Sequence, residues 1–595
     1  MSFNRYFHDE LTALRDLGKE FSLKNPRLAP FLADEAQDPD VERLLEGVAF
    51  LTGRLRQKLD DELPEITHSL MALLWPGFLR PVPSMSVVQF TPIISLSEPQ
   101  TVKKGTEIDS IPVDGTPCRF RTCYDVNMLP LEVLSLNKQD RPKGASLKLA
   151  LGFTAPMAIE DMNLSTLRFF LHGETHVAQS IYLWMFRYLS DMRVRLVGEG
   201  GETLMVMPLP VDAVSPGGFS DKEALLPLNK RVFSGYRLLQ EYFSLPEKFH
   251  FIDIGGLEQL VMLLKHRDIS GQPAELHLEF DFNRAFDSHV SIKAGNFRLH
   301  CTPVVNLFSH DAMPIRLDHR KTEYRLIPQG ENPAHYEVFS IDKVEGWGHG
   351  TREYMRFGRF ESFEHAQSID GIGKGRYYRE RLKSAVSGSG IDTYLAFVTG
   401  AEERLVPQTE SVSIELTCSN RHLPTMLSVG DIQVDTGSSP EYASFENITA
   451  VTPSFTPPLD QGFHWRLIAN MSLNYVSLCD LDTLRTVLST YDYRCFHDRQ
   501  QARASEHRLR GLDAIVSRPA ERLYHGLPVR GIKTILGVKE SAFSSEGDLY
   551  LFLNVLNEFF ALYASINSFH ELEVNGLEQG EVYRWKPRLG QQPLI

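Results

Sequence analysis

The sequence predicts an α+β multidomain protein, in which an N-terminal helical bundle precedes β-rich domains with interspersed helices. Three observations support this prediction. The chain has 595 residues, enough for roughly two to four domains of ordinary size. Apolar residues recur at steps of three and four up to residue 76, and short β-branched and aromatic runs between Pro and Gly turns follow. We expect four domains, at residues 1–80, 81–230, 231–410 and 411–595.

Three helices are expected in the first 80 residues. The first ends at Asn25-Pro26, the second opens at Asp38-Pro39, an acid at the N-cap followed by Pro, and the third spans residues 64–74. The apolar stripes of the first two contain Phe7, Leu11, Leu14, Phe21, Val41, Leu44, Leu45, Val48 and Leu51. Such stripes either form the core of their own domain or pair with helices of another chain. Both readings are open, and the β-rich sequence that follows favours the second.

Beyond residue 80, strand patterns dominate and a few helix patterns interrupt them. Strands are expected at residues 84–90, 164–171, 249–254, 274–282, 297–305 and 411–417, and helices at 236–243, 478–491 and 549–569. The last helix has two adjacent apolar faces, one with Leu551 and Phe559 and the other with Phe552 and Phe560. We therefore expect it to be buried over more than half of its circumference. A finishing strand and tail are expected from residue 576.

Residues 346–390 are rich in Gly, Arg and aromatic residues, and we expect a long loop there. Between Thr351 and Lys383, Lys and Arg outnumber Asp and Glu and alternate with aromatic side chains. Glycine raises the entropic cost of ordering, whereas aromatic residues offer apolar area to offset it. The pattern predicts a segment that is mobile alone and becomes ordered against an acidic partner.

Composition and charge exclude several classes of protein. The formal charge is −14, which argues against nucleic acid as the main partner, because such proteins need excess Lys and Arg. Six cysteines are too few for a disulfide scaffold, and Cys118 and Cys123 have no second pair or nearby His to complete a zinc site. The first ten residues carry charges where a signal peptide needs an apolar core, so we expect a cytoplasmic protein.

Motifs that suggest chemistry do not have the required context. In His172-Gly173-Glu174-Thr175-His176 the Glu lies at the wrong offset for a zinc protease and the stretch follows a strand. Gly371-Ile372-Gly373-Lys374-Gly375 lacks the Ser or Thr of a phosphate loop. We expect no catalytic, cofactor or metal site.

Eight blocks, in order along the chain, resemble the TssF family (also called VasA or ImpG), a baseplate subunit of the bacterial type VI secretion system. They are Tyr6–Phe21 (YFHDELTALRDLGKEF), Asp38–Asp61 (DPDVERLLEGVAFLTGRLRQKLDD), Leu74–Phe90 (LWPGFLRPVPSMSVVQF), Gly235–Phe249 (GYRLLQEYFSLPEKF), Cys301–Phe308 (CTPVVNLF), Cys418–Pro424 (CSNRHLP), Leu473–Leu478 (LNYVSL) and Phe560–Phe569 (FALYASINSF). Each block is a modest pattern, but their order and spacing over the whole chain are specific.

The resemblance implies a non-enzymatic wedge subunit whose fold is similar to contractile phage-tail baseplate wedge proteins. In that family two TssF copies wrap around one TssG, and TssK binds outward and links the wedge to the membrane complex. TssE, the sheath and the spike hub lie nearby, and the plate supports assembly of the tail tube and sheath. The partner-interface candidates are the stripe residues named above, together with Arg376, Tyr377 and Tyr378.

Two other functions are weighed against this one. The first is a β-rich hydrolase whose site is assembled from residues far apart in the sequence, which convergent carboxylates or His in a pocket would support. The second is a single-stranded nucleic-acid binder that uses Thr351–Lys383. The acidic chain as a whole fits a protein partner better.

Overall fold

A computed structural model of the protein divides the chain into two compact units. The first comprises Met1–Leu74 and Leu459–Ile468, and the second comprises Trp75–Pro458 and Ala469–Ile595. The residues that the structure describes are 2–24, 40–54, 70–71, 77–93, 99–141, 143–154, 164–227, 233–266, 273–318, 321–348, 355–360, 376–385, 390–399, 410–458, 461–471, 480–524 and 526–590.

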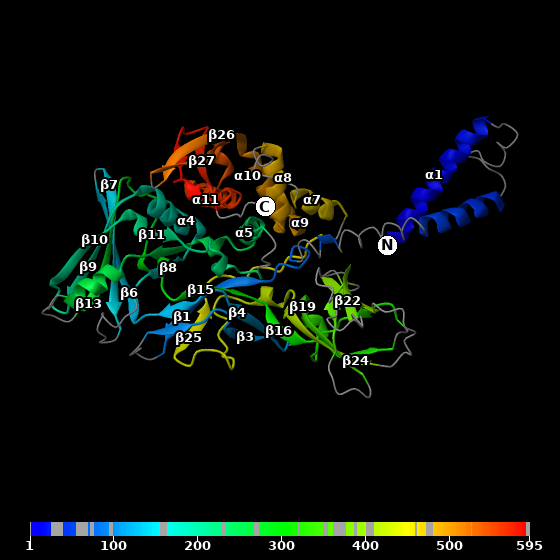
Figure 1. The fold of residues 1–595 in the computed structure, drawn as a ribbon, viewed down its shortest axis with the longest axis horizontal. Helices are drawn as coiled ribbons and strands as arrows, with labels where there is room; N and C mark the ends of the chain where they lie inside the picture. Colours follow the sequence, from blue (N-terminus) through cyan, green and yellow to red (C-terminus); the bar gives the residue numbers. More distant parts are fainter. Residues whose placement is uncertain are drawn as a thin grey trace. The chain divides into compact units, whose positions relative to one another are not determined.

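The first unit contains two of the helices that the sequence predicts. They are α1 (Ser2–Lys24) and a helix over residues 40–54, both blue in Figure 1. An ion pair between Arg15 and Glu42 joins the two helices. The third predicted helix falls largely outside the described residues, of which 70–71 are helical.

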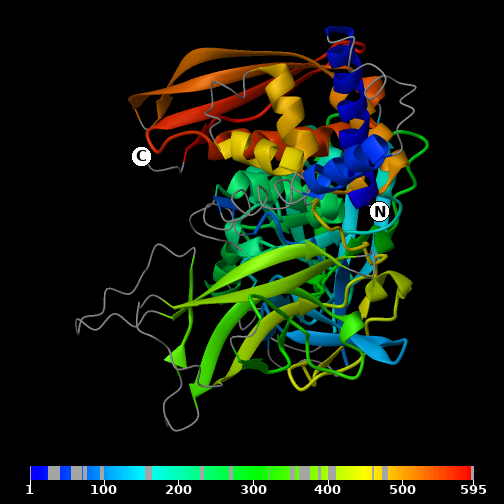
Figure 2. The same cartoon turned by 90° about the vertical axis from the view of Figure 1, so that its right-hand side faces the viewer.

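Helices and sheets form layers in the second unit. A C-terminal sheet, orange and red in Figures 1 and 2, lies over a layer of helices, and the sheets that contain β1 and β24 lie on the other side of that layer. Beyond residue 75 the described helices are α4 (Thr175–Leu183), α5 (Ser234–Ser244), α6 (Glu258–His266), α7 (Gln461–Met471), α8 (Leu481–Tyr491), α9 (Arg494–His497), α10 (Arg499–Arg510) and α11 (Glu546–Leu562). The helices expected at 236–243 and 478–491 are thereby confirmed as α5 and α8.

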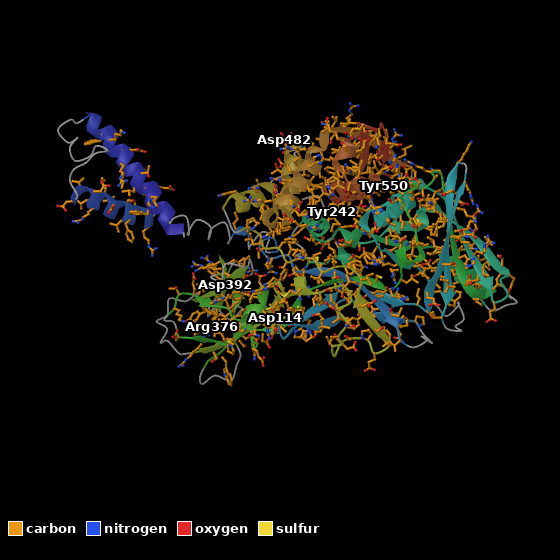
Figure 3. The ribbon with its side chains drawn as sticks, turned by 180° about the vertical axis from the view of Figure 1, so that it is seen from behind. Asp114, Tyr242, Arg376, Asp392, Asp482 and Tyr550 are labelled. Carbon is orange, nitrogen blue, oxygen red and sulfur yellow. The ribbon has the colours of Figure 1, made fainter. Side chains whose placement is uncertain are left out.

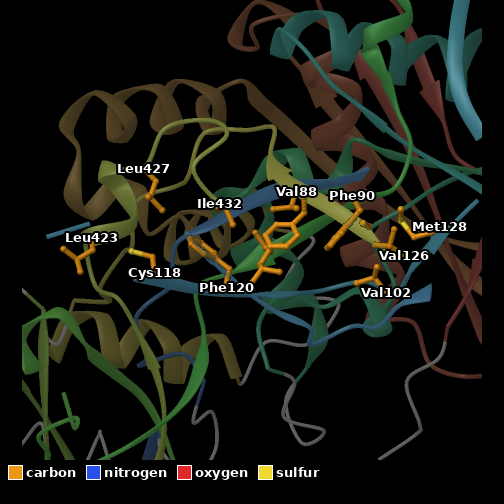
Figure 4. Packing of buried hydrophobic residues seen from close by; sticks show 14 residues of the cluster. Val88, Phe90, Val102, Cys118, Phe120, Val126, Met128, Leu423, Leu427 and Ile432 are labelled. Atoms are coloured by element: carbon orange, nitrogen blue, oxygen red, sulfur yellow. The ribbon is translucent and has the colours of Figure 1, made fainter. Parts of the chain in front are cut away.

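The sheet that contains β1 joins distant parts of the chain. Its strands, in spatial order, are β25 (Ala443–Asn447), β1 (Met85–Pro92), β15 (Cys301–Val305), β4 (Thr116–Thr122) and β3 (Glu107–Val113). Strand β1 pairs antiparallel with both β15 and β25. Its Val88 and Phe90 pack with Phe120 in the buried core shown in Figure 4. The predicted domain boundaries at residues 230 and 410 therefore do not separate independent sheets.

Two further sheets and a small pair confirm most of the expected strands. One sheet has the order β10 (Thr203–Leu209), β9 (Leu189–Gly198), β13 (Pro273–Phe282), β7 (Gly144–Phe153) and β6 (Leu131–Arg141). The second has the order β11 (Val214–Pro216), β12 (Phe251–Ile254), β8 (Leu167–Leu171) and β14 (Phe297–Arg298). The small pair consists of β2 (Gln100–Val102) and β5 (Val126–Met128). The strand expected at 297–305 is broken into β14 and β15, because His300 between them has a φ of 57°, which no strand residue adopts.

The long loop expected at residues 346–390 is largely strand where the structure describes it, so that expectation is wrong for those residues. One sheet there has the order β16 (Phe308–Asp311), β24 (Glu410–Ser419), β19 (Glu337–Gly348) and β20 (Met355–Arg356), and β17 (Ile315–Leu317) also pairs with β24. The other sheet has the order β18 (Tyr324–Arg325), β23 (Ile391–Thr399), β22 (Arg376–Ser384) and β21 (Gly358–Arg359). Strand β22 pairs with β23 along its whole length. Pairing with β23 makes this segment a strand, whereas the glycines that suggested a loop lie before and after β22 in the sequence.

The C-terminal sheet contains a parallel pair that needs a crossover. Its order is β26 (Leu512–Tyr524), β27 (Leu527–Val538), β28 (Ser568–Gly576) and β29 (Val582–Arg584), with β30 (Arg588–Leu589) on β28. Strands β27 and β28 are parallel, so the chain must cross from the end of one to the start of the other. Helix α11 is that crossover, and the strand and tail expected after residue 576 are β29 and β30.

Helix α11 is buried around its whole circumference, as its two apolar faces predict. It begins at the N-cap Ser545, which accepts a hydrogen bond from the Asp548 backbone N–H, and every residue from Gly547 to Ala561 is buried. The helix ends seven residues earlier than expected (562 rather than 569). Ile566 is 51% exposed, and Phe569 is buried in β28 instead. Pairing of Phe569 with Gly531 of β27 requires an extended backbone there.

A buried ion cluster lies beneath helix α5. Glu241 of α5 and Lys248 of the following turn are both fully buried and form an ion pair. Glu241 also pairs with Arg237 at 3.2 Å and accepts backbone N–H bonds from Leu225 at 2.9 Å and Leu226 at 3.1 Å. Burial alone would raise the pKa of Glu241, but Arg237, Lys248 and these hydrogen bonds outweigh it and lower the pKa.

We expect Phe560→Ala to lower the free energy of unfolding by about 3–5 kcal/mol, because the ring is 1% exposed and its removal leaves a cavity in α11. Leu527→Ala is the control, since Leu527 is 69% exposed and should change the free energy by less than about 0.5 kcal/mol. Urea denaturation followed by tryptophan fluorescence measures both. Equal effects would show that Phe560 is not core.

We expect Glu241→Gln to be strongly destabilising, by about 3–5 kcal/mol, because it leaves the buried charge of Lys248 unpaired. Asp221→Asn removes the other carboxylate that pairs with Arg237, but Asp221 is 67% exposed. An exposed pair contributes up to about 1 kcal/mol, so this variant should melt close to the wild type. Similar losses in the two variants would contradict the role given to burial.

Acid should destabilise the second unit through His300. Burial lowers the pKa of His300 to about 4, whereas an unfolded chain binds the proton near 6.5. The contribution of neutral His300 to the free energy of unfolding is therefore at its maximum above pH 6.5, and it is lost as the pH falls from 6.5 toward 4. His300→Asn suits the positive φ and cannot titrate. We expect its unfolding free energy to fall by about 3 kcal/mol less over this range than that of the wild type.

Candidate partner-binding surfaces

The helix over residues 40–54 presents an apolar face to solvent. Leu44, Val48 and Leu51 follow one another at helical spacing and are 68%, 44% and 64% exposed. Leu17 of α1 is 62% exposed as well. The inward side of the same pair of helices is buried at Leu11 and Ala49. Full burial of one such side chain is worth about 1.5–3 kcal/mol, so this face is suited to another protein surface.

The structure distributes the predicted stripe residues over both sides of these helices. Leu11 is buried, Phe7, Leu14, Val41 and Leu45 are half-buried, and Phe21, Leu44, Val48 and Leu51 are exposed. The two readings left open by the sequence therefore apply to different residues. Leu11 belongs to the core of its own unit, whereas the face at Leu44, Val48 and Leu51 remains the interface candidate.

The other predicted interface residues lie on strand β22. Tyr378 is 7% exposed and belongs to the core between the two middle sheets. Arg376 and Tyr377 are half-buried, and the Arg376 guanidinium lies 5.8 Å from the centre of the Phe357 ring. Figure 3 labels Arg376 in this part of the second unit. Tyr378 thus cannot contact a partner directly, and the roles of Arg376 and Tyr377 stay predictions.

The positive charges of β22 are engaged within their own sheet. Arg381 and Lys383 both pair with Glu323, and the Lys383 ammonium lies 4.8 Å from the centre of the Tyr394 ring. Arg359 of β21 pairs with Glu380 at 2.6 Å. These described cations therefore stabilise their own fold, because each of them meets a carboxylate or an aromatic ring.

A cavity of about 850 Å³ tests the hydrolase reading. Its lining includes Arg168, Glu223 and Asp253, three charged groups far apart in the sequence. Arg168 binds Asp253 with two hydrogen bonds of 2.6 Å and approaches Glu223 at 2.5 Å. Burial acts to raise the pKa of Glu223, but Arg168 and Ser220 outweigh it and lower the pKa. Both carboxylates pair with one guanidinium, so these three side chains form an ion-pair network. The buried His300 lines the same cavity, and its Nε2 accepts a hydrogen bond from the Leu129 backbone N–H.

Cys118 and Cys123, the cysteines that lie close together in the sequence, belong to strand β4 and to the residue directly after it. Cys118 and Cys123 are buried, and burial raises the pKa of each thiol to about 12. Cys118 packs in the core of the β1 sheet. Among the described residues there is no group of three His, Cys, Asp or Glu side chains that could hold a metal ion.

No helix in the described part of the chain is both long and apolar enough to cross a bilayer. One exposed apolar surface was missed at the sequence level. At the turn between β26 and β27, Leu523 is 78% exposed and Leu527 69% exposed. The signal that could have found it is a pair of leucines flanking Tyr524-His525-Gly526, where a hairpin turns.

The comparisons with known proteins decide the family. The model of the family described as "Type VI secretion system, TssF" matches residues 1–592. The chain belongs to the TssF family. The "Type VI secretion system component TssF1" of Pseudomonas aeruginosa is 30% identical to it over 632 residues, covering 99% of this chain and 98% of that protein. The resemblance noted in the sequence is thereby confirmed over nearly the whole chain.

Two solved structures share the TssF fold. A chain in a cryo-electron-microscopy structure of a TssK-TssF-TssG baseplate subcomplex matches with a TM-score of 0.76 and 31% identity, over 92% of this chain and 98% of that one. A chain in a structure of the type VI secretion baseplate complex matches with a TM-score of 0.62 and 27% identity over the whole of both. The mixed helix and strand architecture with N-terminal helices, expected from the sequence, is confirmed.

Proposed function

We propose that this TssF-family chain is a non-enzymatic structural subunit of the type VI secretion baseplate. It forms a wedge with TssG and a second copy of TssF, and the wedge supports assembly of the tail tube and sheath. The observation that carries the proposal is the exposed apolar face at Leu44, Val48 and Leu51. A baseplate chain of the same fold was solved together with TssK and TssG, which supports these two as partners.

The remaining partners and the location follow from the same proposal. TssK binds on the outward side and links the wedge to the inner-membrane complex, so the chain is cytoplasmic and meets the membrane only through TssK. TssE, the sheath and the spike hub lie close to the wedge. Arg376 and Tyr377, half-buried on β22, are candidates for a contact with an acidic partner surface. Nucleic acid is not a partner, because the chain carries a formal charge of −14.

Co-expression with TssG and TssK of the same secretion system tests the proposal. The mass of the purified assembly, measured by native mass spectrometry, should contain two copies of this chain for each TssG. A chain that purifies alone under these conditions would overturn the proposed assembly.

Leu44→Asp should abolish that complex and leave the melting temperature of the isolated chain nearly unchanged. The side chain is 68% exposed, so a carboxylate there is solvated in the free protein but would be buried in the interface. Met262→Asp on α6 is the matched control, because Met262 is 64% exposed and lies in the other unit. It should keep the complex intact. Loss of folding in Leu44→Asp would place Leu44 in a core and contradict the interface.

A further inference from the structure

A second cavity lies among the helices of the second unit, and no part of the proposed wedge contact accounts for it. Its volume is about 760 Å³. It is lined by α4, the C-terminal end of α5 and the turn that follows it, α9, α10, the start of α11 and the extended segment Ala450–Phe455. Pockets of this size bind a compact group of atoms with a few fixed polar contacts. Tyr242, labelled in Figure 3, is one of its lining residues.

Gln179 of α4, one of the lining residues, has a buried acceptor without a donor. The residue is 5% exposed, and its Nε2 donates to Asp548 Oδ1 at 3.4 Å. Both carboxylate oxygens of Asp548 also accept hydrogen bonds from the Arg508 guanidinium, so they act as acceptors toward Gln179 as well. The amide orientation is therefore set, and Oε1 must face away from Asp548. Within the described structure, no donor reaches Gln179 Oε1.

Asp492 is the second such group. It is 5% exposed, and its Oδ1 meets no hydrogen-bond donor in the parts of the chain that the structure describes. It is the C-cap residue of α8, at the negative end of that helix. A carboxylate is unfavourable there, since helix C-terminal ends are stabilised by cations. The Cys495 thiol hydrogen-bonds to the Asp492 side chain, so Oδ1 is the oxygen that is left without a donor. A buried acid that breaks this local rule and keeps one unfilled oxygen indicates a site that is completed by something else.

The charge of the cavity points to a cation. Its lining carries the carboxylates of Glu247, Asp492, Asp498 and Asp548 and the guanidinium groups of Arg494 and Arg508, a net charge of −2 with His497 neutral. Arg508 is already bound to Asp548 at 2.9 Å. Among the described residues, the two buried lining atoms without a hydrogen-bond partner, Gln179 Oε1 and Asp492 Oδ1, are both acceptors, and the lining as a whole is negatively charged. The missing occupant is therefore a positively charged group rich in N–H donors.

We propose that this cavity receives an arginine side chain of a partner subunit. A guanidinium has five donors in a planar fork, so it can serve more than one acceptor, and it is less strongly hydrated than a lysine ammonium. Aromatic rings at Tyr242, Phe243 and Phe455 line the same cavity and offer faces for it. The inference rests on the proposed function, because it needs a partner docked over this part of the chain.

Asp492→Asn tests the proposal in the full-length chain, since it removes the charge and keeps the shape. Asp482→Asn is the matched control: Asp482 lies in the first turn of α8, its side chain is 88% exposed, and it is labelled in Figure 3. Affinity for the co-purified TssG–TssK pair should fall about tenfold in Asp492→Asn, about 1.4 kcal/mol, and stay at the wild-type level in Asp482→Asn. Acetyl-arginine methylamide should raise the melting temperature of the wild type, whereas its neutral citrulline isostere should not.

A second variant guards against misfolding of the first. Ala504 is an exposed residue of α10 that lines the cavity, and Ala504→Arg brings a guanidinium from within the chain. It should also weaken partner binding, while keeping the fold.

Equal affinity of the folded Asp492→Asn and Asp482→Asn chains would overturn this inference and leave the wedge proposal standing. If acetyl-arginine methylamide or spermidine binds and neither cavity variant changes partner affinity, the occupant is a small cation and the docking proposal is overturned. A wild-type chain that forms no complex would overturn the proposed function itself.

Discussion

Helix α11 has no side that faces water, and the arrangement of the second unit follows from that constraint. A helix that is apolar all round must be covered on every face. Helix α4, helix α5 and strand β28 contact α11, and they come from widely separated parts of the chain. The parallel pairing of β27 with β28 holds both ends of α11 in place, because the helix is the only connection between the two strands. Burial of one segment therefore requires several distant ones to assemble together.

The polar groups beneath α5 make that assembly specific. A fully buried carboxylate such as Glu241 is tolerated because two cations and two backbone N–H groups surround it. Those partners lie on α5, on the turn after it and on the loop before it. Displacing any one of them would remove part of the compensation for the buried charge, so the cluster favours a single placement of α5. Tyr236 on the same helix stacks on Tyr491 of α8 at 4.8 Å and extends this placement to the next helix.

Interface candidates and cores in this chain contain the same types of apolar residue, and the exposed fraction of each side chain tells the two apart. In the first unit, Leu11 is buried while Leu44 and Leu51 face solvent. In the second unit, the cations of β22 are satisfied by Glu323 and by aromatic rings. In the cavity lined by α4 and α10, the Oδ1 atom of Asp492 receives no hydrogen bond from the described part of the chain. A partner site therefore differs from a structural one in having exposed apolar side chains or acceptors without donors, and not in its residue composition.

The sequence by itself determined the α+β class, the first two helices, most strands and the burial of α11, because periodicity of apolar residues reports local structure directly. It also determined the family, through motifs spread over the chain. Tertiary structure alone decided that residues 376–384 form a strand, since pairing with β23 depends on residues beyond that segment. It decided which stripe leucines are buried, and it placed Gln179 and Asp492 in the lining of one cavity. Those facts depend on contacts between positions hundreds of residues apart, which no local pattern encodes.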